Sequence, residues 1–224
     1  MVIYEIVSIV AFLAALGWAI NSKNPFNLGA VIGGFFLFVF DWIWCGKWFF
    51  NATFTSNLTM IPGIDIMGQQ YPIAVACNWS VGFGLMPLLL SKYHGTLSSK
   101  LGMLHVPVVL VVAAVFDMLA EIPLVSGLGV YTYHQSPEYL LWGVAWSNLW
   151  LGAGILALPY FGFAYVQKWA AIPPNAGFSL SSETTWKGIV MSAATLWASF
   201  FIMGVPQIFW YSHAAPWVES GRLF

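Results

Sequence analysis

The chain has 224 residues, of which 60% are hydrophobic, 18% aromatic and only 7% charged, and its formal net charge is −1. A soluble domain carries roughly a quarter charged residues, so this chain has too few to cover itself with a water-compatible surface. The composition predicts an integral membrane protein. The near-neutral charge without basic clusters argues against a nucleic-acid partner, and the length fits a single domain, residues 1–224.

A membrane-spanning helix needs about 20 predominantly apolar residues. Six such stretches follow one another along the chain, so we expect an all-α polytopic helix bundle with about six spans, or seven if one is hidden. The expected spans are 2–20, 28–45, 72–91, 101–123, 139–167 and 186–211. Polar connections are expected at 21–26, 92–100 and 168–185.

The segment between the second and third spans, 46–71, does not fit either a span or a loop. Its sequence, GKWFFNATFTSNLTMIPGIDIMGQQY, is too interrupted by Asn, Pro and Gly to span a membrane, yet it is too aromatic for a solvated loop. We expect it to lie in the membrane interface or to fold back over the bundle. A shorter segment of the same character occupies 124–137.

The basic residues predict the orientation. In the six-span arrangement one face carries five lysines, while the other carries Lys47 and Arg222; the five are Lys23, Lys92, Lys100, Lys168 and Lys187. Lys and Arg are enriched in cytoplasmic loops, so the five-lysine face is predicted to be cytoplasmic. Both termini would then lie on the opposite side of a plasma membrane or an ER-type membrane.

Four carboxylates are expected to meet at that opposite side. Asp41 ends the second span, Asp117 and Glu121 occupy the last two turns of the fourth, and Asp65 lies in the 46–71 segment. In an up-down bundle the second and fourth spans leave the membrane on the same side. An ionisable group at membrane depth costs at least about 2.5 kcal/mol, so such groups usually serve a function.

Asp117 and Glu121 are four residues apart and therefore share one helical face. Burial and repulsion between like charges favour the protonated form of a carboxyl group. We therefore expect one of the pair to stay protonated near neutral pH and to act as a general acid, with Asp41 as the partner acid or cation stabiliser.

Further polar and aromatic residues are expected at the same end and would bind the substrate: Trp44, Trp48, Asn51, Asn57, Asp65, Asn78, Tyr131 and Tyr133. Aromatic rings from 42–54 would form a wall that attracts a developing positive charge. The four histidines and two cysteines show no ligand spacing, so no metal and no cofactor are expected.

Three stretches carry a resemblance to a known family. FDWIWCGKWFFNATFTSN at 40–57, IPGI at 61–64 and MLAEIPLVSGLGVYTYH at 118–134 resemble the AveC-like membrane spirocyclases of actinobacteria, which are associated with spiroketal polyketides. The resemblance covers about a third of the chain. It implies cofactor-free, acid-assisted ring closure or dehydration of a lipophilic intermediate, and it points to Asp41, Asn51, Asn57 and Glu121.

Two alternatives remain open at this stage. CNWSVGFG at 77–84 is faintly similar to the Asn-Trp helix motif of fungal meroterpenoid and indole-diterpene membrane cyclases, but the acid that should follow the Trp is missing. The other alternative is a small proton-coupled carrier or a subunit of a membrane complex, with the same acids as a proton relay. Carriers usually contain an internal repeat, which this sequence lacks, so a membrane cyclase or isomerase is favoured.

Overall fold

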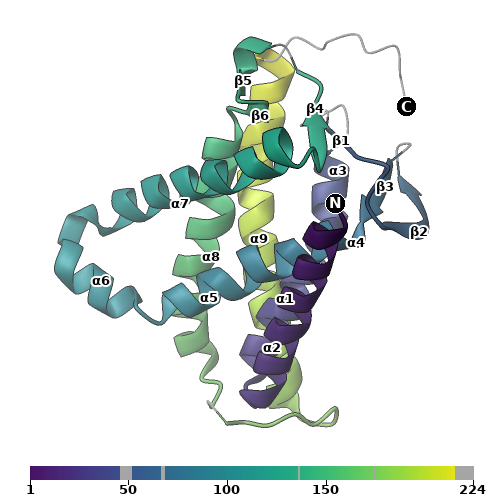
Figure 1. The fold of residues 1–224 in the computed structure, drawn as a ribbon. Coiled ribbons are helices and arrows are strands. Elements are labelled where there is room, and N and C mark those ends of the chain that lie inside the picture. The colour runs from purple at the N-terminus through teal and green to yellow at the C-terminus, as the bar shows by residue number, and fades with distance from the viewer. Residues whose placement is uncertain (46–51, 67–68, 136, 174, 215–224) are drawn as a thin grey trace.

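Six helices long and apolar enough to cross a membrane dominate the computed structural model, which describes residues 1–45, 52–66, 69–135, 137–173 and 175–214. The spans are Val2–Asn21, Pro25–Ile43, Ile73–Ser91, His94–Gly127, Asn148–Ala170 and Glu183–Gly204. The predicted all-α polytopic membrane bundle is therefore confirmed. In Figure 1, α8 (Asn148–Ala170) and α9 (Glu183–Ala214) run along its length, with α1 (Val2–Asn21) and α2 (Pro25–Phe35) in front of them.

Three of the spans are built from several helical pieces. The second joins α2 to α3 (Phe38–Trp44). The third consists of α4 (Ile73–Trp79), a π-helical segment η1 (Ser80–Leu85) and α5 (Met86–Ser91). The fourth contains α6 (His94–Leu101), η2 (Gly102–Leu104), α7 (His105–Ile122) and a second π-helical segment, η3 (Pro123–Gly127). π-Helical segments often occur at functional sites.

Small residues allow α2 to lie close to α9. Gly29 and Gly33 are four residues apart on α2, in the spacing that favours close packing of membrane helices. A Cβ atom added to Gly29 would lie 2.5 Å from Ile189 Cα, and one added to Gly33 would lie 2.8 Å from Ala193 Cα. The start of α2 is fixed locally, because Asn24 Oδ1 accepts a hydrogen bond of 2.9 Å from the Phe26 amide and Pro25 occupies the first turn.

Two predicted boundaries are wrong. The expected polar connection 92–100 is largely the helix α6, which continues into the fourth span after a break at Gly102, where φ is +53°. The expected fifth span begins late, because 139–147 contain a hairpin of β5 (Leu140–Leu141) and β6 (Val144–Ala145). Its two turn residues, Trp142 and Gly143, both have positive φ, as a tight hairpin of this kind requires.

The described parts of the segment 46–71, residues 52–66 and 69–71, fold back over the bundle, which is one of the two expected arrangements. Within it β1 (Ala52–Phe54) pairs antiparallel with β4 (Tyr131–Tyr133) from the 124–137 segment. A second pair joins β2 (Met60–Ile66) to β3 (Gln69–Pro72). Tyr71 is fully buried in the main core. The two segments that the sequence marked as unusual thus form one cover at the same end of the molecule (Figure 1).

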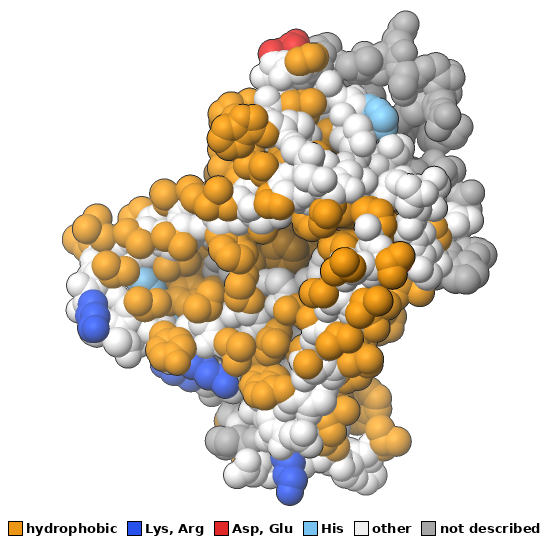
Figure 2. Space-filling view, viewed as in Figure 1, with side chains coloured by type: hydrophobic (Ala, Val, Ile, Leu, Met, Phe, Trp, Pro, Cys, Tyr) orange, Lys and Arg blue, Asp and Glu red, His pale blue; other side chains and the backbone are white. Residues whose placement is uncertain are grey.

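The lysines of the described chain gather at the other end. They lie in the turn after α1, at the end of α5, on α6, near the end of α8 and in the first turns of α9. In Figure 2 the visible basic side chains occupy the lower and left edges, whereas the visible acidic group is at the top. Lys47 and Arg222, which were assigned to the opposite face, lie outside the described residues.

Candidate functional site

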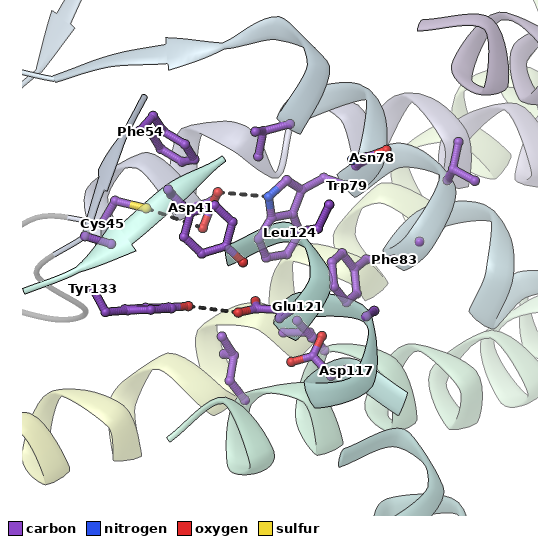
Figure 3. Close-up of a pocket in the computed structure, with 18 of the residues that line it drawn as sticks. Asp41, Cys45, Phe54, Asn78, Trp79, Phe83, Asp117, Glu121, Leu124 and Tyr133 are labelled. Atoms are coloured by element: carbon purple, nitrogen blue, oxygen red, sulfur yellow. Dashed lines mark hydrogen bonds between the residues drawn. The ribbon is translucent and has the colours of Figure 1, made fainter. Parts of the chain in front are cut away.

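Asp41, Asp117 and Glu121 line one cavity of about 320 Å³. Asp41 reaches it from α3, while Asp117 and Glu121 reach it from the last two turns of α7. The predicted convergence of these three acids is confirmed, because the ends of the second and fourth spans do meet at the same end of the bundle. Figure 3 shows the three carboxylates around a common space.

Asp41 is held by donors from distant parts of the chain. Its Oδ2 accepts a hydrogen bond of 2.8 Å from Trp79 Nε1 and another from the Tyr71 hydroxyl. Cys45 Sγ lies 3.9 Å from its Oδ1. The indole N–H can only donate, so Asp41 Oδ2 is an acceptor in this arrangement. The side chain is buried and firmly oriented rather than free to move.

Glu121 is the centre of a second network. Its Oε2 accepts a hydrogen bond of 3.0 Å from the Tyr133 hydroxyl and another from Asn148 Nδ2, and Tyr131 also bonds to this carboxylate. The amide of Asn148 lies 2.7 Å from the Tyr133 hydroxyl as well. Residues from α7, β4 and the first turn of α8 therefore fix one carboxylate. In Figure 3 Tyr133 approaches Glu121 from one side, with Phe83 on the other.

Asp117 differs from the other two acids. It is only 3% exposed, and its Oδ2 has no hydrogen-bond partner among the described residues. The backbone of α8 comes very close to it, because a Cβ atom added to Gly152 would lie 2.2 Å from Asp117 Cβ. A buried polar atom without a partner is costly, and this oxygen lies on the side of Gly152, while the Asp117 side chain also lines the cavity.

The cavity is otherwise aromatic and aliphatic. Rings from six elements line it: Tyr4, Phe54, Trp79, Phe83, Phe116, Tyr131 and Tyr133. The Trp79 and Phe83 ring centroids are 4.4 Å apart, and those of Tyr131 and Tyr133 are 5.5 Å apart. Leu151 and Ile155 of α8 add an aliphatic part. Ring faces attract positive charge, and apolar walls limit the entry of water.

The predicted substrate-binding residues are only partly brought together. Tyr131, Tyr133 and Asn78 line the cavity, and Asn78 Nδ2 donates a hydrogen bond of 2.7 Å to the Tyr4 hydroxyl. Asn57 is exposed in the turn after β1 and does not line the cavity, so the structure does not bring it together with the acids. A polar turn between a strand and the next buried residue, Leu58, faces outward.

Four other predicted site residues lie, wholly or by their side chains, outside the described structure. Trp48 and Asn51 lie outside the described residues, as do the side chains of Trp44 and Asp65. Of the predicted aromatic wall in 42–54, Phe54 lines the cavity, but Trp42 is buried in the core and does not. The wall is formed mainly by rings from other elements, because α3 turns its Trp42 side toward Tyr71.

The sequence analysis missed three residues that hydrogen-bond to the acids of the cavity. Trp79 and Tyr71 hold Asp41, and Asn148 holds Glu121. Trp79 stood beside the noted Asn78 and could have been included with it. Asn148 had been placed well inside the fifth span, because the hairpin of β5 and β6 was not recognised, so its position in the first turn of α8 was not evident.

Two tyrosines outside the spans have perturbed acidities. Burial, and secondly the neighbouring Asp41 carboxylate, raise the pKa of Tyr71 well above its ordinary value. Burial, and secondly the Glu121 carboxylate, raise the pKa of Tyr131 in the same direction. Both phenols therefore remain protonated donors toward the acids of the cavity.

Within the described part of the chain, no group of three or more His, Cys, Asp and Glu side chains is arranged to hold a metal ion. The polar groups that line the cavity are carboxylates, phenols, an indole, the Asn78 amide and the Cys45 thiol. Comparison of the chain with protein-family models, with curated proteins and with solved structures found no match.

Proposed function

We propose that this polytopic membrane protein is a cofactor-independent cyclase or isomerase that performs acid-catalysed ring closure of a lipophilic polyketide or terpenoid intermediate. One observation supports the proposal above all: an aromatic, largely apolar cavity is lined by three carboxylates, and among the described residues one Asp117 oxygen has no hydrogen-bond partner. The resemblance to the AveC-like spirocyclases favours the same chemistry. Of the positions it indicates, Asp41 and Glu121 lie in this cavity.

The two acids of α7 would have different roles, Asp117 as the proton donor and Glu121 as a proton relay. Asp117, as the carboxylic acid, gives its proton to a carbonyl, hydroxyl or epoxide oxygen of the substrate. A substrate hydroxyl, or an alkene where an epoxide is opened, then attacks the electron-poor carbon. The proton lost by that hydroxyl, or by the carbocation that the alkene leaves, passes to the Asp117 carboxylate, directly or through Glu121. A protonated carbonyl or hydroxyl oxygen departs as water, whereas an opened epoxide oxygen stays as a hydroxyl. General acid–base groups contribute roughly 10²–10⁴-fold to a rate.

The hydrogen bonds that orient Glu121 and Asp41 would support this ring closure. Tyr133 and Asn148 hold Glu121 in place beside the acid, and Trp79 and Tyr71 hold Asp41 across the cavity. A positive charge that develops on carbon would lie near two anchored carboxylates and several ring faces, all of which stabilise it. Because the donors are already oriented, no reorganisation is required during the reaction.

The test uses purified protein in liposomes with two lipophilic probes: a dihydroxyketone, which closes to a spiroketal, and a polyprenyl epoxide, which closes to a terpenoid ring. We expect catalysed closure of one probe. Asp117→Asn and Glu121→Gln should each reduce it by at least about 10²-fold. Glu138→Gln is the matched control, because Glu138 is exposed and lies outside the cavity.

The probes also separate the alternatives. Closure of the epoxide alone would assign the protein to the terpenoid type rather than the spiroketal type. Uptake of protons driven by a pH gradient, without any product, would favour the carrier. Closure at the wild-type rate by both Asp117→Asn and Glu121→Gln would exclude acid catalysis by this pair.

A further inference from the structure

The cavity opens sideways, between α7 on one side and α1 and η1 on the other. Phe116 and Ala120 of α7, Gly82 and Phe83 of η1 and Tyr4 of α1 line this side of it. Phe116 is 48% exposed, and Ala120 is also exposed, so the cavity lining reaches the outer surface here. Figure 2 shows the apolar face hollowed between these helices. We call this opening the lateral mouth.

The lateral mouth lies between the two spans that have the most exposed apolar surface. Only 17% of the residues in the most apolar stretch of Val2–Asn21 and of His94–Gly127 are buried, compared with 39% to 61% in the other four spans. Val111, Val112, Val115 and Leu119 on α7 are exposed, as are Ile3, Ile6 and Val7 on α1. Apolar side chains exposed along membrane spans face lipid, so the mouth opens toward the hydrocarbon rather than toward water.

Polarity changes from the mouth to the depth of the cavity. Apart from Tyr4, whose hydroxyl accepts a hydrogen bond from Asn78, the residues at the mouth are apolar: Phe116, Ala120, Gly82 and Phe83. The deep part holds Asp117, which is against Gly152 of α8, and Asp41, which is buried under β3 and α4. A ligand that hydrogen-bonds to the carboxyl group of Asp117 must place an oxygen function at the deep end.

We infer that the ligand of this cavity is a single-headed lipid with an oxygen function near one end, which enters from the bilayer head first and leaves its chain in the lateral mouth. The inference rests on the cavity of the proposed function, but it does not depend on the reaction. It defines the substrate class by shape: one polar end, which Asp117 receives, and one long apolar end, which remains among α1, α7 and lipid.

The experiment uses photo-crosslinking of hexadecanol in liposomes that contain the protein. One probe carries a diazirine beside the hydroxyl, and the other carries it at the methyl end. We expect the head-end probe to label the deep cavity, at Trp79, Tyr133 and Leu151, and the tail-end probe to label Val115 and Leu119 on the outer surface. Peptide mass spectrometry locates both sets of adducts.

Gly82→Leu is the decisive variant. A Cβ atom added to Gly82 meets nothing within 4 Å, so the larger side chain extends into open space at the mouth without a backbone clash. Gly17→Leu is the matched control, since a Cβ atom added there also meets nothing within 4 Å and Gly17 does not line the cavity. Ala120→Leu blocks the same opening from α7, in case Gly82→Leu fails to fold.

Deep labelling that disappears in Gly82→Leu or Ala120→Leu and persists in Gly17→Leu would support the inference. Deep labelling by the tail-end probe would overturn the head-first orientation, and labelling confined to outer surfaces would overturn lateral entry altogether. Asp117→Asn should keep the deep adducts, because an amide still hydrogen-bonds to a hydroxyl. Deep adducts without any acid-dependent turnover would therefore refute the proposed reaction alone.

Discussion

Asp117 on α7 and Gly152 on α8 touch so closely that any side chain at position 152 would occupy the space of the carboxylate: an added Cβ atom would lie 2.2 Å from Asp117 Cβ and 2.7 Å from Asp117 Oδ2. The glycine allows α8 to approach the acid, and the acid in turn is closed off from lipid on that side. The position of Asp117 in the cavity therefore depends on a residue 35 positions away along the chain.

Gly152→Ala should destabilise the protein and displace Asp117. Overpacking of a tight contact typically costs about 1–3 kcal/mol, and unfolding in detergent measures it. Gly17→Ala is the control, because the space around Gly17 is open and alanine favours a helix by roughly 0.5–1 kcal/mol. Equal stabilities for the two variants would show that the contact between α7 and α8 is not tight.

Trp79→Phe should lower the free energy of unfolding, because it removes a hydrogen bond to Asp41. The change keeps a ring in the wall but removes the indole N–H that donates to Asp41 Oδ2 at 2.8 Å. A buried acceptor that loses its donor costs roughly 1–3 kcal/mol. In an Asp41→Ala background, which has no acceptor at this position, the same change should cost less, and a double-mutant cycle of unfolding free energies measures the difference. A coupling free energy of zero would contradict the assigned hydrogen bond.

Stability at alkaline pH should depend on Tyr71. Its pKa is raised by burial and by Asp41 above the ordinary value of about 10. The folded state thus keeps a proton that the unfolded state loses. The resulting stability is fully present below the ordinary pKa and is lost as the pH rises through the folded pKa. Tyr71→Phe should abolish this part of the decline, as unfolding curves between about pH 9 and 12 would show; an unchanged slope would argue against the raised pKa.

The orientation of the spans remains a prediction, and exposed threonines at the two ends test it. Thr96 lies on α6, among the lysines, and Thr132 lies on β4, in the cover of the cavity. A membrane-impermeant thiol reagent should label Thr132→Cys from the non-cytoplasmic side and Thr96→Cys from the cytoplasmic side. The native Cys45 and Cys77 are buried and provide a low background. Labelling of both threonine variants from one side would refute the predicted arrangement.

Composition and spacing were enough to predict the membrane class, about six spans and the convergence of Asp41, Asp117 and Glu121. Spans are predicted from hydropathy averaged over about 20 residues, so a local break in a helix does not hide them. The spacing of four places Asp117 and Glu121 on one helical face, and the alternation of spans brings the end of the second to the end of the fourth. None of these inferences requires knowing how two helices pack.

The residues that hydrogen-bond to Asp41 and Glu121, or pack against Asp117, could be identified only from the tertiary structure. Trp79 and Tyr71 reach Asp41 because α3 ends beside α4 and β3. Asn148 reaches Glu121 because a hairpin with two positive-φ residues delays the start of α8. Which side chains touch across two helices depends on their crossing and on local breaks that span-length hydropathy averages away. The unpartnered oxygen of Asp117 and its contact with Gly152 arise in the same way, from packing between α7 and α8.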